Sequence, residues 1–401
     1  MRQDILETDV LISGGGVAGL TAAAAFGAAG FRVICVDPTP PVTAEADAGA
    51  DLRTTAFLQP SVRVLEAAGL WPRLAPHAAA LQVMRIIDAG GAEPTARLVR
   101  DFDAQEISDQ PFGWNLPNWL LRREMVARIA ELPQVTFLPG TATTGIIPRD
   151  AQAQVTLSDG RVVAARLVIA ADGRHSTLRQ ALNIPVKTTH FGQKALAFAV
   201  THPVPHDHVS TEIHRSGGPF TLVPLPDRDG LPSSAVVWME RGPEALRLAN
   251  LPIPEFEAAI FARSTGLWGP LTLATGRSVW PMISQIAERF DGPRTALIAE
   301  AAHVIPPIGA QGLNMSLADI DCLLGLCLDA PTSIGSPEML ATYQRRRWPE
   351  VKARVTGIGA LNRASMVASR PLRDLRAGVL GALYSLAPVR KTLMRAGLGL
   401  K

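Results

Sequence analysis

The N-terminal part of the chain alternates between apolar runs of strand length and a run of helix-forming residues. Residues 10–12 are apolar, residues 20–26 are rich in alanine, and residues 31–36 are again mostly apolar. A strand, a helix and a second strand in this order predict a βαβ unit with two parallel strands. Residues 167–171 form a wholly apolar run, which is typical of a central strand buried on both faces.

The pattern changes between residues 188 and 280. Short apolar stretches such as 235–238 follow one another and are separated by turns that contain proline and glycine. This pattern is typical of antiparallel strands and predicts a second, mostly antiparallel unit. An apolar run at 295–299 then predicts a return to the first sheet, with a strand that ends at Glu300 and a long helix that begins near Gly312.

These patterns together predict an α/β protein. The expected architecture is a Rossmann-like domain of parallel strands, an inserted, mostly antiparallel β domain, and a helical C-terminus. The chain enters the first domain more than once, so the domains are discontinuous. We assign residues 1–75, 100–182 and 275–341 to the first domain, 76–99 and 183–274 to the second, and 342–401 to the C-terminal helical region.

A glycine motif connects the first strand to the first helix. Residues 14–19 read Gly-Gly-Gly-Val-Ala-Gly, which is the pattern G-x-G-x-x-G. Gly14 permits a tight turn, Gly16 lets the backbone approach a pyrophosphate, and Gly19 lets the helix pack closely on the strand. Asp37 ends the second strand about 20 residues further on, where a carboxylate can accept hydrogen bonds from ribose hydroxyls. The alternative is a glycine-rich turn in an ordinary βαβ unit.

Composition and charge narrow the classes of function. The chain has 401 residues, of which 47% are hydrophobic and 19% charged, as in a globular protein. The net charge of +3 gives no reason to expect a nucleic-acid partner. The cysteines, Cys35, Cys322 and Cys327, suggest neither a disulfide framework nor a metal site, which suits the cytoplasm. We see no signal-peptide pattern, and no apolar run reaches the length of about 18 residues that a spanning helix needs.

Two later segments carry further candidate chemistry at strand ends. Asp172 and Gly173 follow the central strand, at the edge where open α/β sheets bind ligands. In the second segment Glu300 ends a strand, a Pro-Pro turn follows at 306–307, and a glycine-flanked stretch leads into a helix. The backbone N–H groups of residues 312–314 would point at any group that gains negative charge there.

At these positions the chain resembles a known family over essentially its whole length. It resembles the FAD-dependent aromatic hydroxylases of the para-hydroxybenzoate hydroxylase type, and among them most of all the UbiH/UbiF-type ubiquinone-biosynthesis hydroxylases. The motifs that carry the resemblance are residues 14–19, Asp172-Gly173, 191–195, 223–226 and 303–314 followed by Asp319.

The resemblance implies a role for each matched position. The first domain would be the FAD-binding domain and the second the substrate domain. Cofactor-binding roles fall on Gly14, Gly16, Val17, Ala18, Gly19, Asp37, Arg53, Arg122, Asp172, Gly173, Glu300, Gly312, Leu313 and Asn314. Pro307, Gly309 and His303 would be the catalytic positions beside the flavin ring. Arg123 is an alternative to Arg122, and a structural role is an alternative for His303.

The sequence departs from the family at two positions. Ala299-Glu300 stands where the family usually has Gly-Asp, so the carboxylate has one more methylene and reaches the cofactor from a slightly different backbone position. Asp37 stands where the family commonly has glutamate. Both changes keep a carboxylate, so FAD binding is still expected.

The resemblance also implies the reaction. FAD would be bound, NAD(P)H would reduce it as a transient co-substrate near Asp172, and O₂ would give a C4a-hydroperoxyflavin that hydroxylates the ring of a polyprenylated phenol. Such chemistry needs an enclosed apolar pocket that excludes water. The alternatives are a hydroxylase of a soluble phenol, a prenyl-chain reductase, and a non-catalytic FAD-binding scaffold of a ubiquinone-biosynthesis complex.

The C-terminal stretch 370–401 alternates apolar and basic residues at helical spacing. Such a segment can lie on an anionic surface, which would place a cytoplasmic protein peripherally on the inner face of the membrane, near a prenylated substrate. The alternative is a C-terminal helix that packs on the body of the protein and leaves its basic face in solvent.

Overall fold

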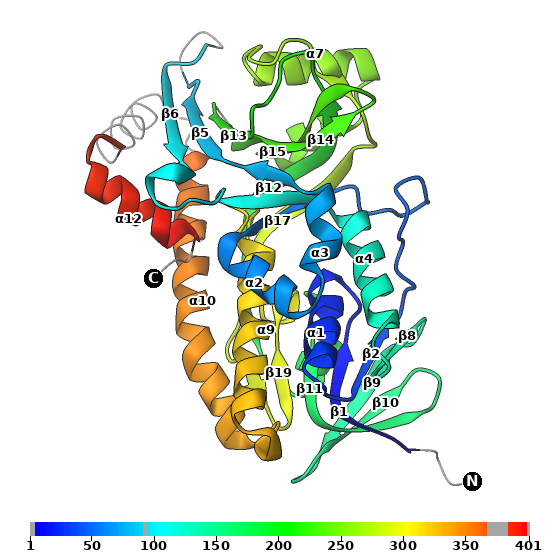
Figure 1. The fold of residues 1–401 in the computed structure, drawn as a ribbon. Helices are drawn as coiled ribbons and strands as arrows, with labels where there is room; N and C mark the ends of the chain where they lie inside the picture. Colours follow the sequence, from blue (N-terminus) through cyan, green and yellow to red (C-terminus); the bar gives the residue numbers. More distant parts are fainter. Residues whose placement is uncertain (1–4, 91–94, 216, 367–383, 399–401) are drawn as a thin grey trace.

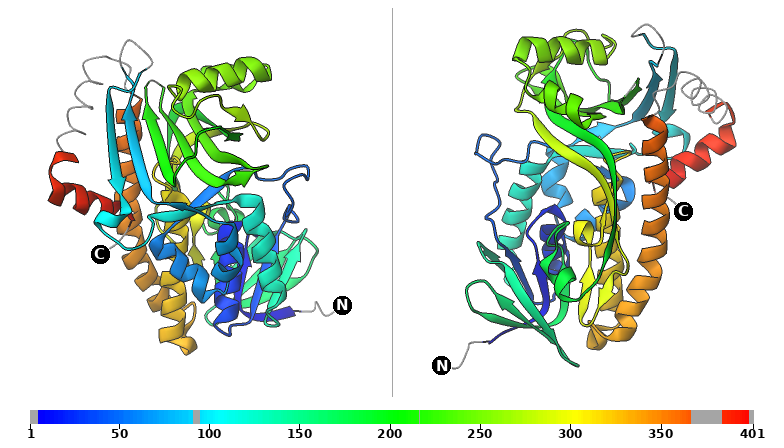
Figure 2. Two further views of the ribbon diagram at one scale, coloured as in Figure 1. Left: turned by 45° about the horizontal axis from the view of Figure 1, so that its top comes forward. Right: turned by 180° about the vertical axis from the view of Figure 1, so that it is seen from behind.

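The computed structural model describes residues 5–90, 95–215, 217–366 and 384–398. Within these residues the strands form an eight-stranded, a nine-stranded and a three-stranded sheet. Figure 1 shows the two large sheets one above the other, with helix α10 (Pro337–Ser365) running alongside both. Figure 2 shows α10 from behind, where it follows one side of the two lobes. This long helix therefore touches elements of both sheets.

The first sheet holds the predicted βαβ unit. Its strand order is β18-β19-β11-β1-β2-β8, and the β9–β10 hairpin continues from β11. The parallel strands are β1 (Ile5–Ser13), β2 (Val33–Asp37), β8 (Val135–Pro139), β11 (Val162–Ala170) and β19 (Thr295–Leu297). The antiparallel strands are β9 (Thr143–Pro148), β10 (Ala153–Leu157) and β18 (Asp291–Gly292). The prediction of a central strand at 167–171 is confirmed, because β11 lies between β1 and β19.

Helix α1 (Val17–Ala28) is buried along most of its length. It follows β1 directly and packs among β2, α2 (Gln59–Ala67), α4 (Asn118–Ala130) and α9 (Gln311–Asp329). The alanines at 22–25 are at most 1% exposed. A helix that is apolar on every side belongs inside a protein, so α1 forms the centre of the first lobe.

The second sheet is mostly antiparallel, as predicted. Its order is β20-β17-β12-β15-β14-β13-β5-β6, and only β13 and β5 pair in parallel within it. Its strands are β5 (Val83–Asp88), β6 (Leu98–Asp103), β12 (Val186–Thr201), β13 (Val209–His214), β14 (Pro219–Arg228), β15 (Leu231–Arg241), β16 (Thr272–Leu273, beside β12), β17 (Ser278–Ala287) and β20 (His303–Val304). Helices α6 (Gly242–Ala249) and α7 (Ile253–Arg263) cover one face with an apolar core.

The remaining elements connect the lobes. A small sheet of β3 (Thr54–Leu58), β7 (Gly113–Pro117) and β4 (Ala79–Leu81) lies between them, with the short helix α3 (Trp71–Leu74) nearby. The short helix α5 (Thr177–Ala181) follows β11. Helix α12 (Ala387–Leu398), red in Figure 1, lies beside α10. Among the described helices, none is long and apolar enough to span a membrane.

One predicted element boundary is wrong. The strand expected at 295–299 ends at Leu297, and Glu300 lies on the short helix α8 (Ala299–Ala302). The backbone of Ala299 has φ +53°, a left-handed conformation that an extended strand cannot contain. The apolar run continues past the turn, so hydrophobicity alone could not locate the end of the strand.

Candidate active site

The glycine motif forms a tight loop at the carboxyl end of β1. Gly14 has φ +112°, and a Cβ atom there would collide with the Ala171 carbonyl. A Cβ on Gly19 would collide with the Gly14 carbonyl, whereas a Cβ on Gly16 would meet nothing within 4 Å. Gly14 and Gly19 are therefore required for packing, and of these three glycines only Gly16 has free space where a side chain would stand. Gly16 also caps α1 without a side chain, and so leaves N–H groups at the helix start.

Asp37 closes this loop from the end of β2. Its carboxylate accepts a hydrogen bond from the Gly15 N–H at 2.6 Å and another from the Thr39 N–H at 2.8 Å. A carboxylate offers about four lone-pair sites, so these two bonds leave capacity for a ligand hydroxyl. Asp37 thus shapes the glycine loop in addition to facing its cavity.

A cavity of about 330 Å³ lies over the glycine loop and includes Gly14, Gly16, Asp37, Asp172 and Gly173 in its lining. Asp172 Oδ2 accepts a hydrogen bond from the backbone N–H of Leu178 at 3.2 Å. The buried Oδ1 of the same carboxylate has no hydrogen-bond partner among the described residues. Burial raises the pKa of the Asp172 carboxyl. An unpartnered carboxylate oxygen beside open glycines is a site prepared for a hydroxyl-bearing ligand.

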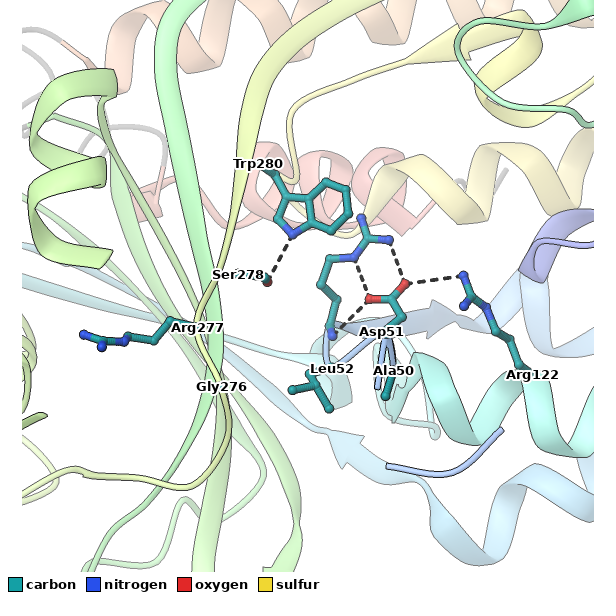
Figure 3. A pocket seen from close by; sticks show the side chains of 10 residues that line it. Ala50, Asp51, Leu52, Arg122, Gly276, Arg277, Ser278 and Trp280 are labelled. Atoms are coloured by element: carbon teal, nitrogen blue, oxygen red, sulfur yellow. Dashed lines mark hydrogen bonds and ion pairs between the residues drawn. The ribbon is translucent and has the colours of Figure 1, made fainter. Parts of the chain in front are cut away.

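A second cavity, of about 280 Å³, lies between the lobes (Figure 3). Arg53 donates to both oxygens of Asp51, at 2.8 and 2.7 Å, and its guanidinium lies 4.0 Å from the centre of the Trp280 ring. Burial would raise the pKa of Asp51, but the bonds and charge of Arg53 outweigh it and hold the pKa below its usual value. Arg53, expected near the flavin, is therefore held in place by Asp51 and Trp280.

Of the two arginines left as alternatives, Arg122 faces this cavity. Its Nη2 lies 3.8 Å from Asp51 Oδ2, and its buried Nε has no hydrogen-bond partner in the described part of the chain. Arg123 instead pairs with Glu124 at 2.8 Å and lies over the Trp119 ring. The geometry thus favours Arg122 as the anion-facing residue.

The sequence analysis did not single out Asp51 or Trp280. Both line the second cavity, and both position Arg53. A carboxylate two residues before a candidate arginine was the available signal for Asp51. No local pattern could have placed Trp280, because it comes from β17, far away in the sequence.

The loop between β20 and α9 carries the residues predicted beside the flavin ring. Pro307 and Gly309 are exposed, while His303 is buried and bonds through Nε2 to Asp319 Oδ2 at 2.8 Å. The Asn314 side chain donates to the Ala56 carbonyl at 2.8 Å and so ties α9 to β3. The geometry therefore favours the structural alternative for His303 and gives the Asn314 side chain a structural contact.

The backbone N–H groups of Gly312 and Leu313 lie in the first turn of α9, where intrahelical partners are missing. Glu300 lies on α8, with a side chain that is 51% exposed and 3.8 Å from Arg174 Nε. This carboxylate is available to a ligand from the solvent side. Among the described residues, no group of three or more His, Cys, Asp or Glu side chains could hold a metal ion.

A Rossmann-like sheet with an open glycine loop, beside an antiparallel sheet, defines a dinucleotide-binding protein. The model of the FAD-binding domain family matches residues 7–357. Among relatives, a ubiquinone hydroxylase (UbiL) of Rhodospirillum rubrum is 31% identical over 98% of this chain and 89% of its own. The 3-demethoxyubiquinol 3-hydroxylase of Escherichia coli is 26% identical over 98% and 99%.

Solved structures agree on the fold. The p-nitrophenol 4-monooxygenase PnpA of Pseudomonas putida has a TM-score of 0.80 at 18% identity and covers 99% of this chain and all of its own. PqsL of Pseudomonas aeruginosa has a TM-score of 0.77 at 23% identity and covers 94% of this chain and all of its own. The chain therefore belongs to the family of FAD-binding monooxygenases, and it is an FAD-dependent enzyme of that class.

Proposed function

We propose that this enzyme hydroxylates the aromatic ring of a polyprenylated phenol in ubiquinone biosynthesis, with NAD(P)H as reductant and O₂ as oxidant. The observation that carries the proposal is the 31% identity, across nearly both chains, with a relative named as a ubiquinone hydroxylase. Three further relatives with ubiquinone or ubiquinol in their names cover at least 96% of this chain. NAD(P)H is the reductant typical of the family.

The residues around the glycine loop fit FAD. The cavity contains an open Gly16 and an unpartnered Asp172 oxygen, and the second cavity contains an unpartnered Arg122 nitrogen. A dinucleotide offers phosphates for Arg122 and the start of α1, and hydroxyls for Asp172 and Asp37. When bound, FAD supplies the electron transfer to O₂ that no protein side chain provides.

The chain's own contribution is placement and exclusion of water. Ala195, Met239 and Met282 on the second sheet form an apolar cluster against Trp280 and Ile308. Ile308 belongs to the loop that follows β20, so the cluster joins the sheet to the loop expected beside the flavin. We propose that the phenol ring lies against this apolar wall, where water is kept from the reacting atoms.

The proposal includes peripheral contact with the membrane on its cytoplasmic side through the C-terminal stretch, and membership of a ubiquinone-biosynthesis complex. Within the part of 370–401 that the structure describes, Leu386 and Leu393 are 57% and 49% exposed, and Lys391 and Arg395 are also exposed. Residues 370–383 and 399–401 lie outside the described residues. Exposed apolar and basic side chains on one helix are what an anionic surface attracts.

The FAD site is tested with Gly16→Val. Because a side chain at Gly16 meets no protein atom within 4 Å, the variant should fold normally while blocking the cavity. Gly357→Val is the matched control, because a Cβ on this exposed glycine of α10 also meets nothing. Purified Gly16→Val should be colourless and the control yellow. A Gly16→Val protein with full flavin absorbance would overturn the assignment of this loop.

The reaction is tested in a deletion strain. Mass spectrometry should reveal a prenylated intermediate that lacks one ring hydroxyl, and the purified enzyme should convert a prenylated phenol faster than a soluble phenol. Conversion of soluble phenols alone would identify a different hydroxylase. Bound FAD with no NAD(P)H oxidation in the presence of any phenol would identify a scaffold.

A further inference from the structure

A continuous series of polar contacts links the two ends of the loop between β20 and α9. At the first end, His303 Nε2 lies 2.8 Å from Asp319 Oδ2, and Arg347 Nε donates to Asp319 Oδ1 at 2.8 Å. Arg347 Nη1 then donates to Glu350 Oε2 at 2.6 Å. These contacts connect β20 and α9, the two elements that the loop joins, to α10.

The series returns along α10 to the other end of the loop. Glu350 Oε1 accepts from Arg354 Nε at 3.3 Å, and Arg354 Nη1 donates to Gln311 Oε1 at 2.8 Å. Gln311 Nε2 then donates to the Gly309 carbonyl at 2.9 Å. The same amide donates to the Gly397 carbonyl of α12 at 2.8 Å. One side chain thus joins the loop, α10 and the C-terminal helix.

The backbone at this junction is one that needs support. Gly309 and Ala310 have φ +64° and +55°, so two successive residues are left-handed and the second one carries a Cβ. Residues other than glycine hold such conformations only when their surroundings impose them. Gln311 supplies a contact to the carbonyl of the first of these residues, and Arg354 fixes the rotamer of Gln311.

We infer that Gln311 and Arg354 are positioning residues for the flavin-side loop, and that α12 shares in this role through Gly397. The inference rests on the proposed function, in which residues 307–314 border the flavin. Neither side chain needs to touch the cofactor. They would hold the N–H groups at the start of α9 in the geometry that the cofactor needs, as supporting contacts do in other sites.

A purely structural role makes a different prediction. Arg354 and Glu350 form an i,i+4 pair on the surface of α10, and such pairs contribute little to global stability. Loss of the junction should therefore leave the thermal unfolding temperature of the FAD-free protein unchanged and weaken FAD binding. A structural role alone would lower the unfolding temperature first.

The test uses Gln311→Glu and Arg354→Gln in the full chain. Glutamate at 311 keeps an acceptor for Arg354 but loses the donor to Gly309 and Gly397. We expect the FAD dissociation constant, measured by flavin fluorescence, to rise about threefold to tenfold in each variant, as for the loss of one hydrogen bond. Arg354→Lys should restore part of the affinity. Arg345→Gln, an exposed arginine on the same helix, is the control and should bind FAD as the wild type does.

The share of α12 is tested with a chain that ends at Ala396. It should raise the FAD dissociation constant by no more than Gln311→Glu does, because it keeps the contact of Gln311 with Gly309, and the two changes combined should cost no more than Gln311→Glu alone. If all these variants bind FAD as the wild type does while Gly16→Val is colourless, the inference about the junction is wrong and the proposed FAD site is still supported. If Gly16→Val keeps its flavin, the proposed FAD site fails instead.

Discussion

His303 and Asp319 form a hydrogen bond of 2.8 Å with side chains that are only 1% and 0% exposed. The other oxygen of Asp319 accepts from Arg347, which is also buried. His303 is therefore buried in a network of charged side chains formed by Asp319 and Arg347. Its side chain is closed to solvent, whereas Pro307, four residues later, is exposed.

Replacing the central carboxylate should destabilise the protein strongly. Asp319→Asn removes the buried counter-charge of Arg347 and leaves it paired only with the half-exposed Glu350, and breaking a buried pair in this way costs about 3–5 kcal/mol. Urea unfolding of the variant should show this loss, whereas Asp321→Asn, an exposed carboxylate on the same helix, should stay close to the wild type. Equal midpoints for the two variants would mean that the network does not stabilise the fold.

Asp172 should make stability depend on pH in the opposite way from a paired carboxylate. Burial raises the pKa of its carboxyl in the folded protein, so the ionised form destabilises the folded state above that pKa. Asp172→Asn should therefore raise the unfolding temperature of the FAD-free protein at pH 7. The gain should shrink as the pH falls through the raised pKa toward the unfolded value of about 3.9. FAD binding should weaken in the same variant, and a gain that does not vary with pH would contradict this account.

Replacing Ala299, whose backbone is left-handed, with glycine should stabilise the folded protein. At φ +53° an alanine is strained, and glycine removes the strain at some cost in chain entropy. Ala299→Gly should raise the free energy of unfolding by up to about 1 kcal/mol. Ala301→Gly, on the same short helix but buried with ordinary φ, should lower it. Calorimetry of the two variants tests the sign of each effect.

Glu300 should contribute to FAD affinity from the solvent side of the site. If its carboxylate accepts from a cofactor hydroxyl, Glu300→Ala should lose about 1–3 kcal/mol of binding free energy, while Glu300→Asp should lose little. Titration of the FAD-free protein measures both. An unchanged dissociation constant for Glu300→Ala would show that this half-exposed side chain serves Arg174 alone.

Local pattern predicts the elements of this fold well, because strands and helices carry their periodicity in their own residues. The glycine loop was predictable because the spacing of its glycines is itself a local pattern, although the Ala171 carbonyl that excludes a Cβ at Gly14 lies far away in the sequence. The end of β19 was not, because a left-handed alanine interrupts an unbroken apolar run. Contacts such as Gln311 to Gly397 join distant segments and follow only from tertiary packing.

The C-terminal helix provides the sharpest test of membrane contact. Arg390 is held by Glu106, with nitrogen–oxygen distances of 3.1 and 2.7 Å, so its charge is already paired. Lys391 and Arg395 are exposed on the same helix, near the exposed Leu393. Each cation near an anionic surface adds on the order of 1 kcal/mol, so exposed cations should matter more than a paired one.

We therefore expect the protein to co-sediment with anionic liposomes at low salt and to be released at high salt, because screening weakens such binding. Lys391→Gln with Arg395→Gln should reduce the bound fraction, whereas Arg390→Gln should reduce it much less. Removal of residues 370–401 should abolish binding and slow turnover of a prenylated substrate more than turnover of a short soluble analogue. Liposome binding that survives this removal would show that the segment serves packing or a protein partner, since the charges proposed to reach the membrane would then be gone without effect.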